Sequence, residues 1–360
     1  MSGDVALRTG TLDAAAFAAA LEHVASGAAA RDRDDAGAFP EDAVVALERA
    51  GALTTPLSYA GELAVLRAVA AADAGVARIL DGHLNAAERL RVQAPAALRE
   101  RELPELAAGR LRAGVWGADP AIPEEGARAS LDGDRITGVK TFCSGAGGLH
   151  RALVLVVEAG GPPLAAWVDL TEPGTVEVDR TWFRGAGMRA SASHRVVFHG
   201  APVLALLGGP GALTEQPWFA RDAVRTAATW AGAADGAVDD ALGHLAARRE
   251  TTDLEALAAG RLETWRHGLG LWLDDAARVL DAAPAPPAAV AARTAAQLRT
   301  AVADGARAIL DEAERATGSR PPVTGAALDR AARDLRLFLL QHRLEPILAR
   351  AGAAALEERR

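Results

Sequence analysis

The sequence predicts a mostly helical α+β protein built from three consecutive parts. These are an all-helical domain over residues 1–110, a middle domain over 111–205 that forms an antiparallel β-barrel, and a four-helix bundle over 206–360. Three observations predict this order. Apolar residues recur at three- and four-residue spacing in alanine-rich stretches at both ends of the chain. Short strand-like segments between glycine-rich turns fill the middle. Aromatic residues make up only 4%, which favours closely packed helices over a β-sandwich.

Length, charge and cysteine content exclude several classes of protein. The chain has 360 residues, half of them hydrophobic, which is enough for a sizeable core. A net charge of -8, without a basic stripe interleaved with aromatics, argues against nucleic-acid binding. The single cysteine, Cys143, excludes an internal disulfide and a cysteine-cluster metal site, and no metal is expected. No signal pattern and no uncharged run of 18 apolar residues is present, so we expect a cytoplasmic protein without a membrane segment.

Five helices are expected in the first part. Asp13 is a plausible N-cap, Pro40 suits a first helical turn, and Pro104 is expected to kink or split the last helix. In order, the expected helices are Ala14–Ser26, Pro40–Ala50, Gly61–Ala72, Gly75–Gln93 and Ala96–Ala108.

The middle part reads as seven short strands followed by a linker. The expected strands are Arg112–Gly117, Ala127–Leu131, Arg135–Val139, Ala152–Val157, Leu164–Asp169, Val176–Asp179 and His194–Phe198. Ala201–Val203 and the glycine-rich Gly208–Gly211 form the expected linker to the last part.

Four long helices with short connections are expected in the last part, a pattern typical of an antiparallel bundle. They are Phe219–Glu250, Asp253–Ala282, Pro287–Thr317 and Gly325–Leu356.

Three segments carry a more specific signal. Residues 138–145 read Gly-Val-Lys-Thr-Phe-Cys-Ser-Gly, in which an aromatic and a hydroxyl lie two residues apart beside glycines. Residues 182–191 read Trp-Phe-Arg-Gly-Ala-Gly-Met-Arg-Ala-Ser, and residues 81–84 read Asp-Gly-His-Leu. A ring and a hydroxyl placed this way could lie against a flat cofactor, and the glycines would allow close backbone approach.

These segments and the domain order resemble the acyl-CoA dehydrogenase superfamily over nearly the whole chain. The resemblance implies non-covalent FAD, oxidation of the CH–CH group of an acyl-CoA-like substrate, and a homodimer or homotetramer. An electron-transfer flavoprotein would be a possible redox partner. It also implies that Phe142 packs on the flavin ring and that Ser144 bonds near flavin N5. Trp116 is either a residue of the flavin loop or core packing, and Arg249 (or Arg248) would reach the FAD pyrophosphate of a neighbouring subunit.

The usual catalytic glutamate of this family is missing. After Arg333-Asp334-Leu335-Arg336, the position expected to hold that glutamate is His342, and the alternative position within Val224–Ala227 contains no acid. Histidine can serve as a base near neutral pH. His342 and His83 also match two histidines that flank the flavin in the reduced-flavin-dependent monooxygenases of the same fold. Those enzymes take reduced flavin, FMN or FAD, from a separate flavin reductase.

Three hypotheses therefore stay open: an FAD-dependent dehydrogenase of acyl thioesters, a monooxygenase of the same fold, and a homologue that has lost its activity. At residues 117–120 the sequence reads Gly-Ala-Asp-Pro where the family has a longer flavin loop. The third hypothesis is suggested by this eroded loop, Ala118–Glu125, and by Glu250-Thr251-Thr252-Asp253 in place of the family's Phe-Gly pair.

Overall fold

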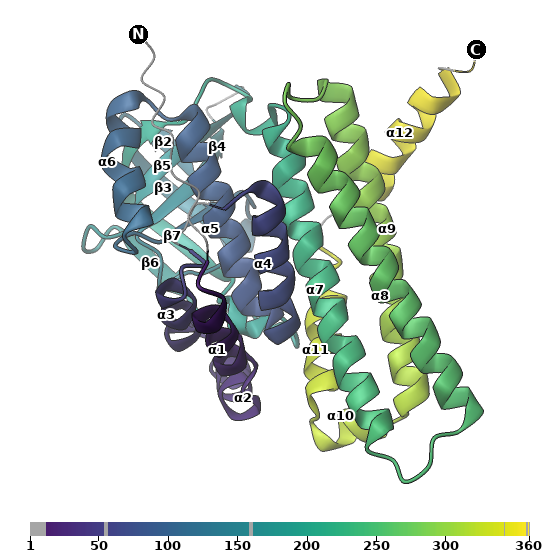
Figure 1. Cartoon of the computed structure of the whole chain (residues 1–360). Coiled ribbons are helices and arrows are strands. Elements are labelled where there is room, and N and C mark those ends of the chain that lie inside the picture. Colours follow the sequence, from purple (N-terminus) through teal and green to yellow (C-terminus); the bar gives the residue numbers. More distant parts are fainter. Residues whose placement is uncertain (1–11, 54–56, 158–160, 342, 358, 360) are drawn as a thin grey trace.

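The computed structural model describes residues 12–53, 57–157, 161–341, 343–357 and 359. The molecule consists of a sheet and two groups of helices, one from each end of the chain (Figure 1). The N-terminal helices α4 (Tyr59–Ala72) and α5 (Ala74–Gln93) lie between the sheet and the long helices of the C-terminal half. The mostly α, α+β fold class predicted from the sequence is confirmed.

The described residues of the N-terminal part form six helices, rather than the five expected. They are α1 (Ala14–Ala25), α2 (Gly27–Ala36), α3 (Glu41–Arg49), α4, α5 and α6 (Ala96–Ala107). The Asp13 carboxylate caps α1 by accepting from two backbone N–H groups, as the sequence suggested. The additional helix is α2, whose polar sequence lacks apolar periodicity. Pro104 lies inside α6 without splitting it.

The sheet is open, so the expectation of a closed barrel was wrong. Its seven strands are β1 (Ala113–Trp116), β2 (Ser130–Asp132), β3 (Arg135–Cys143), β4 (Arg151–Val157), β5 (Pro163–Asp169), β6 (Val176–Asp179) and β7 (His194–Leu206). They follow the order β1-β4-β5-β7-β3-β2, with β6 also paired to β7. β1 pairs with β4 in parallel, and the other ladders are antiparallel. The terminal strands β1 and β2 have four and three residues, which leaves little backbone for a ladder that would close the sheet.

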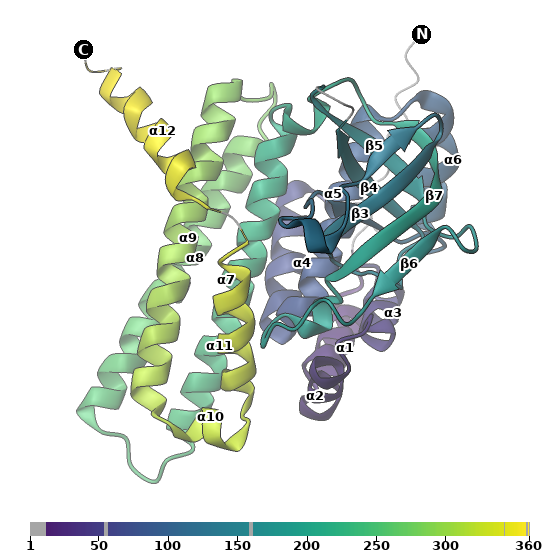
Figure 2. The same cartoon turned by 180° about the vertical axis from the view of Figure 1, so that it is seen from behind.

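β7 joins the two halves of the sheet. Its first half pairs with β3 and β6, and its second half pairs with β5 (Figure 2). The Ala201–Val203 segment, expected to be linker, is part of this strand. Gly200 has a φ of 79°, a backbone conformation that favours glycine, where the pairing register between β3 and β7 shifts.

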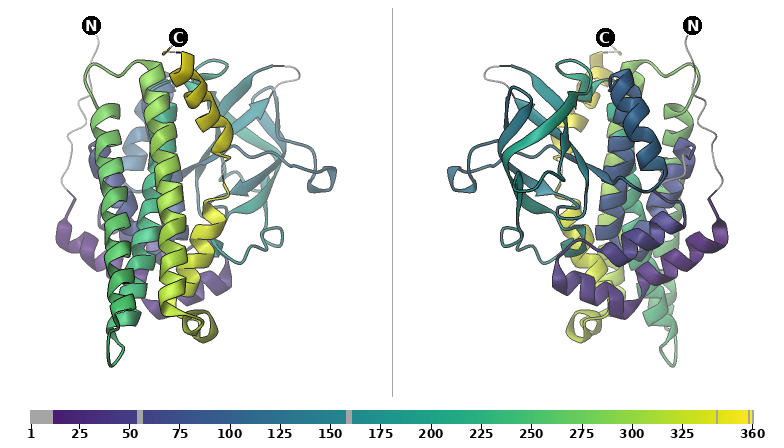
Figure 3. Two further views of the ribbon diagram at one scale, coloured as in Figure 1. Left: turned by 90° about the vertical axis from the view of Figure 1, so that its right-hand side faces the viewer. Right: turned by 90° about the vertical axis from the view of Figure 1, so that its left-hand side faces the viewer.

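The C-terminal half is a bundle of α7 (Trp218–Ala246), α8 (Asp253–Leu280), α9 (Ala288–Thr317) and α11 (Ala327–Phe338), with the short α10 (Arg320–Thr324) between the last two. Figure 3 shows these helices side by side, with the sheet behind them. The fourth expected helix, Gly325–Leu356, is broken: α12 (Glu345–Glu357) is a separate helix that projects from the bundle (Figure 1). None of the described residues of α12 is buried, so packing does not hold it in line with α11.

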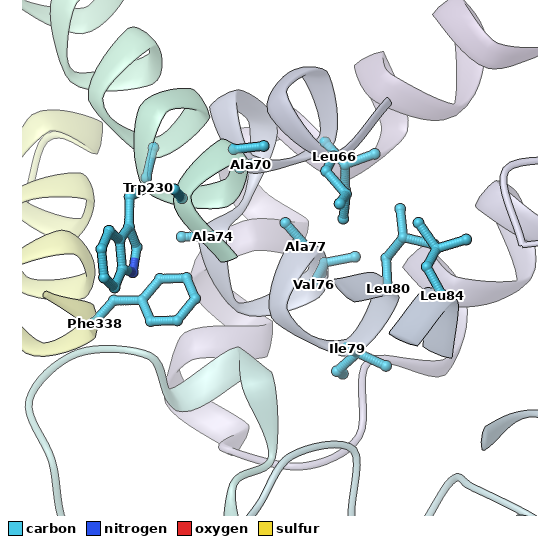
Figure 4. Packing of buried hydrophobic residues seen from close by; sticks show 14 of the residues in the cluster. Leu66, Ala70, Ala74, Val76, Ala77, Ile79, Leu80, Leu84, Trp230 and Phe338 are labelled. Carbon is cyan, nitrogen blue, oxygen red and sulfur yellow. The ribbon is translucent and has the colours of Figure 1, made fainter. Parts of the chain in front are cut away.

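Small residues allow α4 and α7 to pack closely. A Cβ added to Gly232 of α7 would lie 2.1 Å from the carbonyl oxygen of Arg67 in α4. At Gly236, one turn along, the corresponding distance to the Ala71 carbonyl oxygen is 2.5 Å. Leu66 and Ala70 on α4 and Trp230 on α7 belong to the large core beside this contact (Figure 4). The small side chains of alanine and glycine therefore allow the two helix backbones to approach closely.

The same helices share a buried charged cluster centred on Arg225 of α7, whose side chain is fully buried. Its guanidinium donates to Glu62 of α4 at 2.6 Å and to Glu88 of α5 at 2.8 Å. A buried guanidinium is tolerated when carboxylates pair with it and accept its hydrogen bonds. The Arg225 cluster thus ties both N-terminal helices to the bundle.

No helix within the described ranges combines the length and the apolarity needed to cross a membrane.

We predict that Gly232→Ala destabilises the protein, because the new methyl group would overlap the backbone of α4. The free energy of unfolding, measured by denaturant titration, should fall by about 1–3 kcal/mol. Gly243→Ala on the same helix is the matched control, since a Cβ there meets nothing within 4 Å. It should leave stability unchanged or raise it by about 0.5–1 kcal/mol. Equal stability of the two variants would contradict the close contact of α4 with α7.

Candidate functional site

Two segments distant in sequence meet at one end of β3. The backbone N–H of Gly145 donates to the Ser191 carbonyl at 2.9 Å, and that of Ala146 donates to the Ala192 carbonyl at 3.2 Å. These bonds join the turn after β3 to the 3-10 helix η2 (Arg189–Ser191), just before β7. Gly75 near the start of α5 fits against η2, because a Cβ there would lie 2.7 Å from the Ser191 nitrogen. The end of β3, η2 and the start of α5 therefore form one packed unit.

Backbone strain is concentrated in this unit. Among the described residues, three that are not glycine have positive φ: Phe142 at 51°, Met188 at 57° and Ala192 at 45°. All three belong to the joined segments. Such conformations are unfavourable for residues with a side chain and persist where surrounding contacts enforce them, often at functional sites. This clustering marks the unit as the candidate site independently of any motif.

An exposed aromatic surface forms the outer part of the site. The Phe142 side chain is 57% exposed, although it is large and apolar. Its ring meets the Trp182 ring edge-on, with 4.8 Å between centroids and 85° between planes. Trp182 is held in turn by its indole N–H, which donates to the Glu125 carboxylate at 3.0 Å. Together, Phe142 and Trp182 form a rigid apolar surface, here called the Phe142 surface, that a flat aromatic ligand would fit.

Three serine hydroxyls form a chain beside Phe142. Ser191 Oγ donates to the Met188 carbonyl at 2.6 Å, because a carbonyl oxygen only accepts. Ser193 must therefore donate to Ser191 across their 2.7 Å contact. Ser144 must then donate to Ser193 across the 2.9 Å contact between their Oγ atoms. The hydroxyl proton of Ser144 is therefore bonded to Ser193 in this serine chain. Toward any group outside the chain, Ser144 Oγ can only accept a hydrogen bond from an N–H or O–H group.

Trp116 supports the site from inside. It is 1% exposed, and its indole N–H donates to the backbone carbonyl of Ser144 at 3.0 Å. The sequence left core packing and a flavin-loop role open for this residue. In this chain Trp116 is a core residue that fixes the position of Ser144.

The 117–120 segment, which departs from the conserved flavin loop, packs against β3. Lys140 donates to the Asp119 carboxylate at 2.6 Å, and its side chain is only 1% exposed. The Thr141 hydroxyl donates to the Asp119 carbonyl at 3.2 Å. This segment is therefore anchored directly before Phe142.

His83 is bonded on both ring nitrogens. Nε2 lies 3.0 Å from the Leu53 carbonyl, and Nδ1 accepts from the Ala113 backbone N–H at 3.2 Å. These partners require the neutral tautomer with the proton on Nε2. Burial lowers the pKa of His83, which also favours the neutral form. The ring links α5 to the start of β1, and both nitrogens are engaged by backbone groups.

Of the other two predicted site residues, only Arg249 belongs to the described part of the chain. His342 lies outside the described residues, between α11 and α12. Arg249 is exposed in the turn between α7 and α8. In Figure 2 this turn lies at the end of the bundle away from the sheet. Its predicted role toward a neighbouring subunit remains a prediction.

Helix α11 anchors the strained segment, a role that the sequence reading missed. The Met188 N–H donates to the Asp334 carboxylate at 2.5 Å, and the Arg333 guanidinium donates to the Ala186 carbonyl. Gly187 allows this approach, since a Cβ there would lie 2.2 Å from the Arg333 carbonyl oxygen. In the sequence, Asp334 belongs to the Arg333–Arg336 motif, which served to locate the expected catalytic position at residue 342. Nothing in the local pattern indicated that its carboxylate binds a backbone N–H group.

Asp334 is an acid whose folded environment disfavours its charge. Burial raises the pKa of Asp334 to about 7, the charge of Asp73 adds to this, and the bond from Met188 together with Arg330 opposes it. The Arg330 guanidinium lies 3.2 Å from Asp73 but 3.9 Å from Asp334. Arg330 therefore neutralises Asp73 more directly than Asp334.

Among the described residues, no group of three or more His, Cys, Asp or Glu side chains could hold a metal ion. The buried Cys143 lies at the end of β3, and burial raises the pKa of its thiol. That thiol is protonated at neutral pH.

Comparison with solved structures identifies the fold. The chain is similar to the dibenzothiophene monooxygenase TdsC from Paenibacillus sp. A11-2, described in complex with FMN and indole, at 19% identity and a TM-score of 0.82 over 95% of this chain and 97% of that chain. It is similar to the methanesulfinate monooxygenase MsuC from Pseudomonas fluorescens at 20% identity and a TM-score of 0.80 over 94% and 96%. A nitrososynthase from Micromonospora carbonacea var. africana matches at 23% identity and 0.80 over 97% and 98%. No protein-family model and no curated protein sequence matches the chain.

These likenesses show that the chain has the acyl-CoA dehydrogenase fold over nearly its whole length. The fold expected from the resemblance is therefore confirmed.

We predict that Asp334→Asn stabilises the protein at alkaline pH. The raised pKa means that the folded state holds a proton more tightly than the unfolded state, so Asp334 lowers stability progressively as pH rises from about 4 to 7. Asparagine can still accept from Met188, without the charge. The free energy of unfolding at pH 8 should rise by on the order of 1 kcal/mol, with little change at pH 4.

The matched control for this experiment is Asp311→Asn on α9, whose side chain is 75% exposed. It should change stability little at either pH. If Asp334→Asn and the unmodified chain lose stability in parallel between pH 4 and 8, the ionisation of Asp334 does not carry the effect.

Proposed function

We propose that the chain is a flavin-dependent oxidoreductase that binds reduced flavin and oxygenates a small molecule. The observation that carries this proposal is the direction of the serine chain, which leaves Ser144 Oγ as an acceptor beside the Phe142 surface. The N5 atom of oxidised flavin only accepts hydrogen bonds, whereas N5 of reduced flavin bears a hydrogen and donates. The site is therefore complementary to the reduced ring.

The residues present fit a flavin. The exposed Phe142 ring, held edge-on by Trp182, offers an apolar face, and the adjacent segment supplies the Ser144 hydrogen-bond acceptor. Bound reduced flavin would supply two electrons to molecular oxygen, so that one oxygen atom enters the substrate and the other leaves as water. The protein residues orient the ring and exclude water from one of its faces. FMN is the form to test first, because the TdsC structure is described with FMN; FAD, implied by the resemblance, is the alternative.

Two further residues hold Ser144 and the positive-φ residue Met188 in place. Trp116 fixes the Ser144 carbonyl, and Asp334 fixes Met188, the residue whose carbonyl ends the serine chain. We propose that His83 positions β1 against α5, because both of its ring nitrogens are bonded to backbone groups. His342 remains our candidate for proton transfer. A separate flavin reductase would supply the reduced flavin.

The dehydrogenase of acyl thioesters remains the competing function. Removal of a C2 proton needs a positioned base. The α7 segment where the family's alternative glutamate would fall contains no acid, and both Val224 and Ala227 are fully buried. A dehydrogenase would thus depend on His342. A homodimer or homotetramer, in which Arg249 reaches the flavin of a neighbouring subunit, fits either function.

We predict that Ser144→Ala selectively weakens binding of reduced flavin. Loss of the acceptor for N5–H should raise the Kd for dithionite-reduced FMN by about 10-fold, the effect of one hydrogen bond. The Kd for oxidised FMN should change less than about threefold. Anaerobic fluorescence and absorbance titrations measure both values.

Ser130→Ala on the exposed edge strand β2 is the matched control and should change neither constant. Equal weakening of both redox forms by Ser144→Ala would show that Ser144 only shapes the site.

The two enzymatic functions are separated by an anaerobic titration of the flavin-loaded protein with a panel of acyl-CoAs. We expect the oxidised flavin spectrum to persist, because no carboxylate base is found at either of the family's positions. Bleaching by any acyl-CoA would establish the dehydrogenase instead. A protein that binds neither FMN nor FAD would support the inactive homologue.

A further inference from the structure

The turn after β3 and the segment after β6 touch each other at two points beside the Phe142 surface. At one point the rings of Phe142 and Trp182 meet edge-on. At the other, Nη2 of Arg180 lies against Gly147, 3.5 Å from the position that a Cβ on this glycine would occupy. Arg180 precedes Trp182 by two residues, and Gly147 follows Ser144 by three. The guanidinium of Arg180 therefore lies next to the two segments that form the candidate site.

The charge of Arg180 is available to a ligand. Arg180 is exposed, and within the described ranges of the chain its guanidinium makes no hydrogen bond and no ion pair. The adjacent Asp179 carboxylate is occupied by other groups: it accepts from the Thr181 N–H at 3.0 Å and from the Thr181 hydroxyl at 2.7 Å. Its second oxygen lies 3.4 Å from a guanidinium nitrogen of Arg195. A guanidinium stays protonated at any physiological pH, so Arg180 presents a full positive charge.

Gly147 supplies a second donor at the same place. It is exposed, and its φ of 90° favours glycine. The N–H groups of Ala146 and Gly148 donate to backbone carbonyls, whereas the N–H of Gly147 has no acceptor among the described residues. Free backbone N–H groups of such turns bind anions, and the missing Cβ allows an anion to approach the backbone closely. The turn thus offers a charged donor and a backbone donor next to each other.

The other charged groups along this segment do not oppose an anion. The Glu125 carboxylate is engaged, since it accepts from the Trp182 indole at 3.0 Å and from the Ala121 N–H at 2.7 Å. Arg184, on the other side of Trp182, is exposed, and its Nε donates to the Thr181 carbonyl at 3.1 Å. It adds a second positive charge. An anionic group on a ligand of the Phe142 surface would therefore be attracted to this border of the surface.

We propose that Arg180 and the Gly147 turn bind the terminal phosphate of FMN. This inference rests on the proposed flavin function and adds the residues that recognise the phosphate. FMN carries its phosphate one ribityl chain away from its ring, and Gly147 is three residues away from Ser144. A phosphate monoester carries nearly two negative charges at neutral pH, and a guanidinium can bind two of its oxygens at once. The site would thus distinguish FMN from riboflavin, which has the same ring without the phosphate.

The test compares the Kd values of dithionite-reduced FMN and dithionite-reduced riboflavin for the full chain, in anaerobic titrations. The unmodified protein should bind FMN at least about 10-fold more tightly than riboflavin, the effect of one charge-assisted hydrogen bond. Arg180→Gln should weaken FMN binding by about 10-fold and change riboflavin binding less than about twofold. Arg135→Gln is the matched control, because it removes the same charge at the other end of β3, where Arg135 is 45% exposed and paired with Glu172. It should change neither Kd.

Salt dependence gives a second measurement that a folding defect would not imitate. Because Arg180 is exposed, added salt should weaken FMN binding to the unmodified chain more than to Arg180→Gln, and should leave riboflavin binding unchanged. Unchanged FMN affinity in Arg180→Gln, or equal loss of FMN and riboflavin affinity, would overturn the phosphate assignment. The proposed function would survive either result if riboflavin binding still depended on Ser144. If the unmodified chain bound neither flavin, the proposed function and this inference would fall together.

Discussion

The buried guanidinium of Arg225 is the interaction on which the arrangement of the helices depends. It lies on α7 with its side chain fully buried, and its partners Glu62 and Glu88 come from α4 and α5. Removal of Arg225 would leave the buried Glu62 carboxylate without the guanidinium that pairs with it, which destabilises by about 3–5 kcal/mol in comparable cases. The cluster is also directional, because the guanidinium must meet carboxylates from both α4 and α5 at hydrogen-bond distance. Apolar packing of alanine against alanine would tolerate several placements.

Helix α7 contacts both the N-terminal helices and the other helices of the bundle. One side packs on α4 through Gly232, and another carries Trp230 toward Phe338 of α11 and Arg299 of α9. Helix α11 in turn holds the segment before β7 through Asp334 and Arg333. The strained conformations of Met188 and Ala192 therefore depend on contacts made by the bundle as well as by the sheet. The position of the serine chain is accordingly a property of the whole fold.

Two kinds of unfavourable energy are retained in the described part of the chain. At the Phe142 surface it is backbone strain and an exposed aromatic ring; at Arg299 it is a buried guanidinium with two nitrogens that lack a hydrogen-bond partner. Each is a defect if the chain is considered only as a stable fold. The stability of the helical scaffold offsets both.

Periodicity and composition were enough to predict the order of the helical and strand regions, and one motif singled out Phe142 and Ser144 as candidates. The periodicity and the glycine-rich turns located the predicted strands with few errors, since local patterns set local structure, and Val176–Asp179 emerged as predicted. Phe142 and Ser144 could be proposed together because they lie two residues apart in one segment. The tertiary structure decided the rest: the open sheet, the broken last helix, and the bonding of Ser144 to Ser193 and of Met188 to Asp334. Those partners are separated by 49 and 146 residues, and Arg299 is orphaned only because of what surrounds it in the bundle. Such relations arise from packing between distant segments, and no local pattern encodes them.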